Sequence, residues 1–235
     1  DLISEVYTKF GFKYTVELST RPDDSMGSDE DWENATNALI TALESKGLPY
    51  EVNEGDGAFY GPKIDFHLED SLGRTWQCGT IQLDFQMPLN FQLEYIDENG
   101  SKQRPVMIHR VCFGSIERFI GILTEHYAGK FPVWLAPVQV KVLAVSDKNL
   151  EYAEKVYQKL SELGIRCELD SRNEKIGYMI REARQIDRGP YMLIIGGREA
   201  ENKTVSVSDR ATDQTESMTF QEFAERIQYE ITKRL

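Results

Sequence analysis

The feature that most constrains the fold is the alternation of apolar runs with amphipathic segments over residues 138–235. Short apolar runs bounded by turn residues predict buried strands, and apolar residues three and four apart predict helices that cover them. The expected strands are Val138–Ser146, Ile165–Asp170, Tyr191–Ile195 and, as an outer strand, Thr204–Arg210; the expected helices are Asn149–Leu163, Lys175–Gln185 and Phe220–Leu235. This alternation predicts an α/β domain of about 100 residues, with one sheet covered by helices.

The first half of the chain shows a different pattern, in which strands predominate. Ser28 has the features of a helix N-cap, because Asp31 follows three positions later and acidic residues fill the first turn. Strands are expected at Phe12–Thr20 and in stretches between Tyr50 and Val111, with a hairpin turn at Glu98–Gly100, and helices from Ser28 to about Ser45 and at Gly114–Tyr127. We expect an α+β fold on an antiparallel sheet, with no convincing first element in residues 1–20.

Composition excludes several classes of protein. The 235 residues hold 27 Lys and Arg against 39 Asp and Glu, and nearly all of the net charge of −12 lies in the first half. An acidic chain disfavours non-specific polyanion binding, so any nucleic acid would need a local basic face, which the second half offers. No apolar run of about 18 residues predicts a membrane helix, and no leader peptide opens the chain. Three widely spaced cysteines fit a reducing cytoplasm.

Residues 104–119 (RPVMIHRVCFGSIERF) are the most informative for chemistry. The segment runs from a strand through a glycine into a helix whose first turn holds Arg118. A helix amino terminus beside an arginine suits a polyphosphate, whereas the alternative is that Arg118 pairs with Glu117 on a solvated face. His109 is a possible zinc ligand, but no neighbouring Cys or His completes a site, and a core histidine is the simpler interpretation.

A second group of polar residues lies earlier in the chain. Strand alternation places Cys78, Thr80 and Gln82 on one face and Gln77 on the other, unless Gly79 marks a bulge. Tyr60 and Lys63, which flank the Gly61–Pro62 turn, could line the same polar pocket; a solvated sheet edge is the alternative. Cys78 has no evident partner base, so it is a weak candidate for a nucleophile.

Arginines gather on one predicted helix of the second half. Arg181, Arg184 and Arg188 lie three and four residues apart, so they are expected to share a helix face that could contact phosphates or bases. A solvated face balanced by Glu182 and Asp187 is the alternative.

Several long segments together resemble the bacterial-type threonyl-tRNA synthetases, which are class IIa aminoacyl-tRNA synthetases. They are GAFYGPKIDF, QCGTIQLDF, HRVCFGSIERFIGILTEH, FPVWLAPVQV and DSRNEKIGYMIREAR, and they cover essentially the whole chain. The resemblance implies that residues 1–133 are the carboxy-terminal part of an antiparallel-sheet catalytic domain, and that residues 134–235 are an α/β anticodon-binding domain. It further implies ATP-dependent activation of threonine and its transfer to tRNA(Thr), by a cytoplasmic homodimer.

The resemblance also assigns roles to the residues above. GSIERF corresponds to the third class motif, so Arg118 would bind the γ-phosphate of ATP. Its neighbours at the nucleotide would be Gln77, Thr80 and Ser115; Tyr60 and Gln82 would line the threonine pocket, with Lys63 near the substrates. His109 is similar to one of the family's three protein ligands for zinc. In this family the zinc ion binds the amino group and the hydroxyl of threonine, and it thereby rejects valine, which has no hydroxyl. Mg²⁺ would accompany ATP.

Other parts of the family pattern are missing or altered. The first two class motifs, the other two zinc ligands, the editing region and the dimer interface have no counterpart, so the chain alone is expected to be inactive. Asn173, Arg181 and Glu199 match the anticodon-binding pattern, whereas Ser208 stands where the family usually has an arginine. Arg210, two residues further along the same strand face, is the candidate to substitute for it. The alternative function is a non-catalytic RNA-binding relative. The set of Tyr60, Gln77, Gln82, His109 and Arg118 argues against it, because RNA binding alone needs no γ-phosphate arginine.

Overall fold

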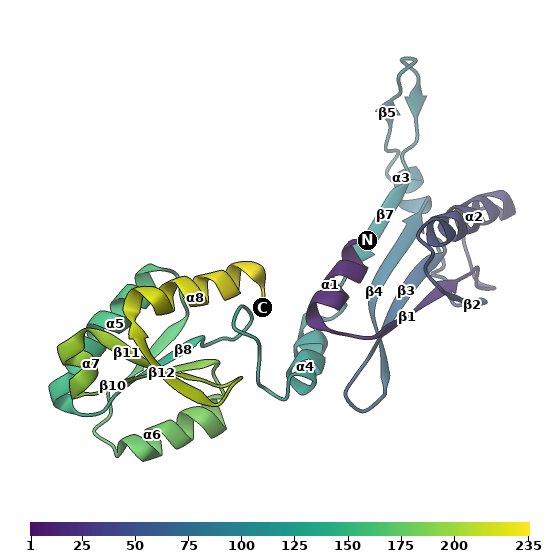
Figure 1. The fold of residues 1–235 in the computed structure, drawn as a ribbon. Coiled ribbons are helices and arrows are strands. Elements are labelled where there is room, and N and C mark those ends of the chain that lie inside the picture. Colours follow the sequence, from purple (N-terminus) through teal and green to yellow (C-terminus); the bar gives the residue numbers. More distant parts are fainter. The chain divides into compact units, whose positions relative to one another are not determined.

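The computed structural model describes all residues from Asp1 to Leu235, and the chain folds as two units, Asp1–His126 and Tyr127–Leu235 (Figure 1). Each unit has its own five-stranded sheet, and a separate two-stranded ribbon belongs to the first unit. The segment with two prolines, Gly129–Pro137, lies within the second unit. No helix in the structure has both the length and the apolar character needed to cross a bilayer.

The first unit contains more strands than the second unit, and most of them are short. Its elements are α1 (Leu2–Phe10), β1 (Tyr14–Ser19), α2 (Asp29–Ser45), β2 (Glu51–Asn53), β3 (Lys63–Glu69), β4 (Thr75–Asp84), α3 (Gln86–Asn90), β5 (Tyr95–Ile96), β6 (Lys102–Gln103), β7 (Met107–Val111) and α4 (Ile116–His126). The sheet order is β2-β1-β3-β4-β7, and only the β1–β2 pair is parallel. The predicted antiparallel α+β fold is therefore confirmed.

Helix α2 forms where its local signals predict it. Ser28 accepts a hydrogen bond from the Asp31 N–H, and the Asp31 carboxylate accepts one from the Ser28 N–H, which makes a complete capping box. Its buried face repeats every three or four residues through Trp32, Ala35, Leu39 and Leu43.

Helix α1 corrects the expectation that residues 1–20 lack a first element. Ile3 and Tyr7, four residues apart, are buried on one face, and Gly11 ends the helix with a φ of 75°. Glycine is favoured there because a left-handed backbone strains other side chains.

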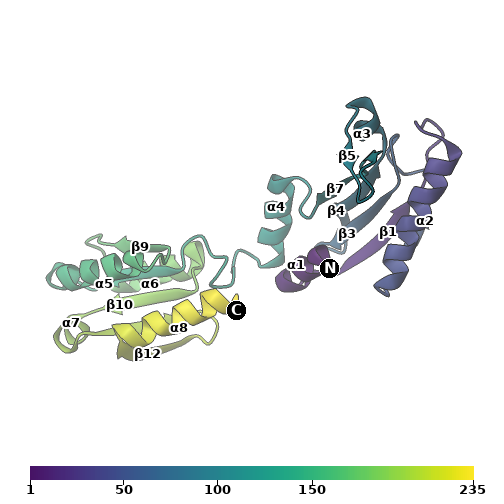
Figure 2. The ribbon, with the colours of Figure 1, turned by 90° about the horizontal axis from the view of Figure 1, so that it is seen from above.

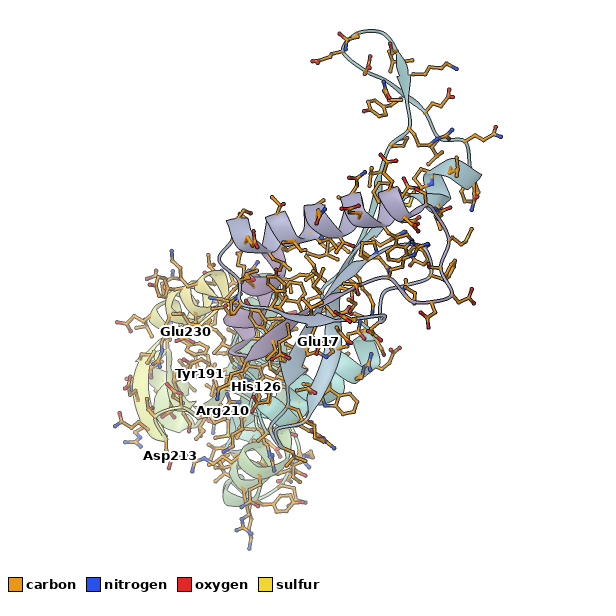
Figure 3. The ribbon with its side chains drawn as sticks, turned by 90° about the vertical axis from the view of Figure 1, so that its right-hand side faces the viewer. Glu17, His126, Tyr191, Arg210, Asp213 and Glu230 are labelled. Atoms are coloured by element: carbon orange, nitrogen blue, oxygen red, sulfur yellow. The ribbon has the colours of Figure 1, made fainter.

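The β5–β6 ribbon projects from the first unit (Figures 1 and 3). Its turn confirms the predicted hairpin at Glu98–Gly100. The Asp97 carboxylate accepts hydrogen bonds from the N–H groups of Asn99 and Ser101, and Gly100 has a φ of 77°. The short helix α3, before the ribbon, was not predicted.

The second unit has the predicted α/β alternation. Its elements are β8 (Val140–Ala144), a 3₁₀ turn (Asp147–Asn149), α5 (Leu150–Glu162), β9 (Cys167–Asp170), α6 (Ile176–Glu182), a π-helical turn (Ala183–Asp187), β10 (Tyr191–Ile195), α7 (Gly197–Asn202), β11 (Thr204–Asp209), β12 (Gln214–Thr219) and α8 (Phe220–Lys233). Strands β8, β9 and β10 are parallel, and the sheet order is β12-β11-β10-β8-β9. The predicted outer position of Thr204–Arg210 is wrong, because β12 pairs with β11 and forms the outer edge.

Helices cover both faces of this second sheet (Figures 1 and 2). Val156 and Leu160 of α5, together with Phe223 and Ile227 of α8, pack in the larger core. Met179 of α6 packs on the opposite face, in a smaller cluster with Leu143 and Met192. The hydroxyl of buried Tyr191 donates to the carboxylate of Glu230 on α8 at 2.8 Å, and Figure 3 shows these two side chains together.

Candidate active site

A β-bulge in β4 decides which of its side chains face outward. Phe66 pairs with Gly79, but the next residue of β3, His67, pairs with Gln77, so Cys78 has no partner opposite it. Cys78 is 2% exposed, whereas Gln77 and Thr80 lie on the same side and their side chains are 3.3 Å apart. A bulge is therefore present, but the residue outside the ladder is Cys78 rather than Gly79, and the placement of Cys78 beside Thr80 is wrong.

A wide cleft of about 720 Å³ opens over β3, β4 and β7 and the loop that precedes β3. Six residues singled out from the sequence line it: Tyr60, Lys63, Gln77, Thr80, Gln82 and His109. The lining also includes Asp56 and Arg110, which sequence reasoning did not select. The sequence therefore brought together the polar side chains of one cleft, although they span about 50 residues of chain.

Tyr60 and Gln82 meet at one end of the cleft. The Tyr60 hydroxyl donates to the Gln82 side-chain oxygen at 2.7 Å, and the Tyr60 ring lies edge-on to His109 with a centroid separation of 6.0 Å. Gly61 allows this approach, because a Cβ at that position would lie 1.8 Å from the Leu83 carbonyl oxygen. The glycine of the GPK turn thus lets the Tyr60 loop lie against β4.

Asp65 lies beneath the opposite part of the cleft and is 1% exposed. One carboxylate oxygen accepts hydrogen bonds from Gln77 Nε2 at 2.5 Å and Thr80 Oγ1 at 2.8 Å. The other accepts from Ser19 Oγ at 3.1 Å and forms an ion pair with Lys63 Nζ at 2.8 Å. Three of the predicted site residues are therefore joined through one buried carboxylate.

Lys63 is held as a cation. Burial lowers the pKa of its ammonium group, but the hydrogen bonds and negative charges of Asp65 and Asp56 outweigh burial and raise the pKa above its ordinary value. The Asp56 contact is 3.1 Å long, so the ammonium lies between two carboxylates. A side chain fixed in this way can bind an anion but is unsuited to accept a proton at neutral pH.

His109, on β7, is oriented by a second buried carboxylate. Its Nε2 atom lies 2.8 Å from Asp84 Oδ2, and the other Asp84 oxygen accepts hydrogen bonds from the N–H groups of Gln86 and Met87. Histidine ligands of metals commonly donate their second ring N–H to a carboxylate, so His109 fits the role of one zinc ligand, through Nδ1. No group of three His, Cys, Asp or Glu side chains suited to a metal is present, and a zinc site would need further ligands.

Ser115 and Arg118 lie at the start of α4, outside the lining of the cleft. The Ser115 hydroxyl donates to the Glu117 carboxylate at 3.0 Å and accepts from the Arg118 N–H at 3.4 Å. The Arg118 guanidinium carbon lies 5.9 Å from the centre of the Trp76 ring, a cation–π distance. The Glu117 carboxylate therefore binds Ser115, while the Arg118 guanidinium lies over Trp76.

Cys78 is poorly suited to nucleophilic chemistry. Burial raises the pKa of its thiol, and the charge of Arg118 offsets only part of that increase. The thiolate is the reactive form of cysteine, so the raised pKa argues against a nucleophile here.

The predicted anticodon residues lie on different elements of the second unit. Asn173 is exposed after β9, Arg181 is exposed on α6, and Glu199 accepts a hydrogen bond from the Gly196 N–H at the start of α7. Because β9 and β10 run parallel, their carboxyl ends lie at the same end of the sheet. Asn173, which follows β9, and Glu199, which follows β10, therefore belong to that end.

The predicted row of three arginines on one helix face is wrong. Helix α6 ends at Glu182 and a π-helical turn follows, which changes the helical spacing. Arg184 donates to Ser208 Oγ at 3.3 Å, whereas Arg188 adopts a left-handed conformation and donates to the Ala128 carbonyl.

Arg210 does not take the place of an arginine at position 208. Its guanidinium donates to the backbone carbonyls of Arg188, Lys130 and Phe131, and burial lowers its pKa. The helix residue Arg184, rather than Arg210, approaches Ser208.

Sequence reasoning missed the two aspartates that organise the cleft. Asp65 lies between apolar residues in KIDF, and Asp84 lies between apolar residues in QLDF, so each is a charged residue in a buried part of its strand. Buried charges are rarely present without partners, and that rule was the available signal.

Comparison with known proteins agrees with this division of the chain. Residues 1–127 match the family described as "tRNA synthetase class II core domain (G, H, P, S and T)", and residues 139–230 match the "Anticodon binding domain". A threonine–tRNA ligase of Acetivibrio thermocellus is 66% identical over 96% of this chain, and one of Carboxydothermus hydrogenoformans is 63% identical over 100%. The chain spans 35% and 37% of the lengths of these relatives.

Solved structures give the same result. The RNA binding domain of threonyl-tRNA synthetase from Cryptosporidium parvum superposes with a TM-score of 0.89 at 42% identity, covering 97% of this chain and 57% of that chain. A putative threonyl-tRNA synthetase from Aeropyrum pernix superposes with a TM-score of 0.74 at 28% identity, covering 99% of this chain and 60% of that chain. The fold is thus part of a class II synthetase core followed by an anticodon-binding domain, and the chain belongs to the class II tRNA synthetase family whose core domain serves the G, H, P, S and T enzymes.

Proposed function

We propose that the intact protein to which this chain belongs is a threonine–tRNA ligase, which activates threonine with ATP and transfers it to tRNA(Thr). The observation that carries the proposal is the single cleft lined by Tyr60, Lys63, Gln77, Thr80, Gln82 and His109. The identity of 66% with a threonine–tRNA ligase supports the same activity. Residues 1–133 would form the carboxy-terminal part of the catalytic domain, and residues 134–235 the anticodon-binding domain.

The chain's own residues suit the first half-reaction. In that step the threonine carboxylate attacks the α-phosphorus of ATP in line, forming threonyl-adenylate and releasing pyrophosphate. We assign Arg118 to the γ-phosphate, because a helix terminus with an arginine provides donors for an anion. Gln77, Thr80 and Ser115 are assigned to the rest of the nucleotide. Lys63, a fixed cation, would bind a negatively charged group of either substrate.

The other end of the cleft suits threonine. Tyr60 and Gln82, hydrogen-bonded to one another, would form the wall of its pocket, and His109 would hold Zn²⁺ together with ligands from outside this chain. When bound, zinc supplies a template for the amino group and hydroxyl of threonine, and a site that engages a hydroxyl rejects the analogue that lacks it. Mg²⁺ would accompany the phosphates of ATP.

The second unit would bind the tRNA anticodon through Asn173, Arg181 and Glu199. Arg184 is a further candidate there, because it is exposed and reaches Ser208. We also propose that the intact protein is a homodimer and acts in the cytoplasm.

The test is amino-acid-dependent exchange of pyrophosphate into ATP by the full-length protein, with threonine, serine and valine compared. Exchange with threonine and almost none with valine is the expected result. Absence of exchange with all three, from folded protein supplied with zinc, would instead favour a relative that binds RNA without catalysis.

A further inference from the structure

Asp65 does not line the cleft but lies directly beneath it. Asp65 belongs to β3, which lies between β1 and β4 in the sheet, and its neighbours across the two ladders are Glu17 and Thr80. A carboxylate that is 1% exposed in such a place loses its hydration, and that loss is compensated only when the group is fully hydrogen-bonded.

All of the contacts of Asp65 are with donors. An ionised carboxylate has about four acceptor positions, and Asp65 fills them with the side chains of Ser19, Lys63, Gln77 and Thr80. Three of these side chains continue into the cleft, whereas Ser19 is completely buried and does not line it. One residue therefore fixes one wall of the cleft from below.

We propose that Asp65 is the positioning residue of the nucleotide half of the cleft, an inference that rests on the proposed ligase function. By accepting from Lys63, Gln77 and Thr80, Asp65 holds all three side chains in one orientation before any substrate binds. Preorganised polar groups stabilise a bound substrate without reorienting, and their value falls when the supporting shell is lost.

Asp65 also sets which groups this wall presents. The Gln77 amide nitrogen has two hydrogens, and these donate to Asp65 and to Thr80 Oγ1. The Thr80 hydroxyl hydrogen likewise donates to Asp65. The Gln77 carbonyl oxygen and the oxygen of Thr80 are therefore left as acceptors, so this wall favours hydroxyl or amino groups of a substrate. Two of the three ammonium hydrogens of Lys63 are taken by Asp65 and Asp56, which leaves one for an anion.

The first experiment is pyrophosphate exchange by the full-length protein carrying Asp65→Asn. An amide in place of the carboxylate puts a donor against other donors, so we expect the KM for ATP to rise on the order of tenfold or more, because a charged hydrogen bond is disrupted. The KM for threonine should change much less, because Tyr60, Gln82 and His109 have no contact with Asp65, and because Lys63, which could serve either substrate, keeps its ion pair with Asp56. Ser19→Ala is the matched control: it removes the 3.1 Å bond to Asp65 and a longer contact of 3.4 Å with Asp56, but no cleft side chain, and it should leave both KM values nearly unchanged.

An unchanged KM for ATP would overturn the proposal, because the substitution would then have no effect on the nucleotide site. An equal rise in both KM values would also overturn it, because that result indicates general damage to the cleft.

A second measurement does not depend on activity or on the variant. In the wild-type 235-residue chain, Gln77 and Gln92 are both exposed, but the Gln77 amide donates to Asp65. NMR should therefore show side-chain amide protons of Gln77 that exchange with solvent at least tenfold more slowly than those of Gln92. Equal exchange rates would refute the Asp65 contact. If the wild-type protein failed to exchange pyrophosphate while the Gln77 amide was protected, the ligase function would fall and the role of Asp65 as an organiser would stand.

Discussion

Replacing Gly79 with alanine should destabilise the first unit through a single atom. A Cβ on residue 79 would lie 2.7 Å from the Tyr7 hydroxyl oxygen, 3.1 Å from the Phe66 Cβ and 3.3 Å from Ile3 Cγ2. The φ of Gly79 is not positive, so alanine would bring no backbone strain. The effect therefore comes from crowding alone, and the Tyr7 hydroxyl is the closest atom.

The magnitude follows from what Tyr7 does. Its hydroxyl donates to the Cys112 carbonyl at 2.6 Å, and its side chain is fully buried. Displacing the hydroxyl would break that bond, at a cost of about 1–3 kcal/mol for a buried group left unpaired. Overpacking costs roughly 1–3 kcal/mol. Because the same displacement relieves part of the crowding, we expect Gly79→Ala to lower the free energy of unfolding by about 2–4 kcal/mol.

A double-mutant cycle with Tyr7→Phe tests this explanation. Hydrogen exchange of β3 and β4 peptides in increasing urea measures unfolding of the first unit, which a whole-chain signal from two units would not resolve. With the hydroxyl absent, Gly79→Ala should cost less by about 1 kcal/mol or more. Costs that add within about 0.5 kcal/mol would show that the Tyr7 hydroxyl is not the atom responsible.

Further expectations concern the two proposed binding sites and the charge of Lys63. In the full-length protein, Arg118→Ala should lower adenylate formation at least tenfold and leave tRNA binding nearly unchanged, whereas Arg181→Ala should weaken tRNA binding and spare pyrophosphate exchange; loss of both activities in either variant would contradict the assignment. His109→Ala should lower the zinc content measured by atomic emission, and dialysis against a chelator should abolish threonine activation. The raised pKa of Lys63 means that its ion pairs contribute fully below its unfolded pKa of about 10.4 and are lost as pH rises through the higher folded value. The stability difference between wild type and Lys63→Met should therefore shrink above about pH 10.4, and a constant difference up to pH 12 would refute the shift.

Local signals allowed part of the fold to be predicted. The Ser28 capping box and the apolar spacing of α2 lie within one segment, so the sequence contains everything needed to place that helix. Strand β12 was missed because its residues are mostly exposed and polar, and an edge strand of that kind lacks an apolar pattern. Helix α1 was missed although Gly11 supplies a stop signal, because its nine residues give only two buried positions.

The site could be predicted as a list of residues but not as an arrangement. Family motifs selected Gln77, Thr80 and Lys63, yet nothing in their spacing indicates that Asp65 holds all three. For Arg210, in contrast, the residue itself was wrongly selected. Strand alternation made it a reasonable RNA contact, but its guanidinium binds backbone carbonyls far away in sequence, and such contacts depend on tertiary structure.

Because Cys78 has no partner in the β3–β4 ladder, the loss of one residue from β4 in a related chain should have different effects at different positions. Gln77, Thr80 and Gln82 face the cleft at intervals of three and then two residues, because Cys78 stands outside the ladder. Losing Cys78 would leave a regular strand in which the same three side chains still share a face, whereas losing Ile81 would turn those on one side of the gap toward the core. An alignment gap in this strand should therefore be acceptable at position 78 and damaging at position 81, and a relative one residue shorter at position 78 should still have the same cleft.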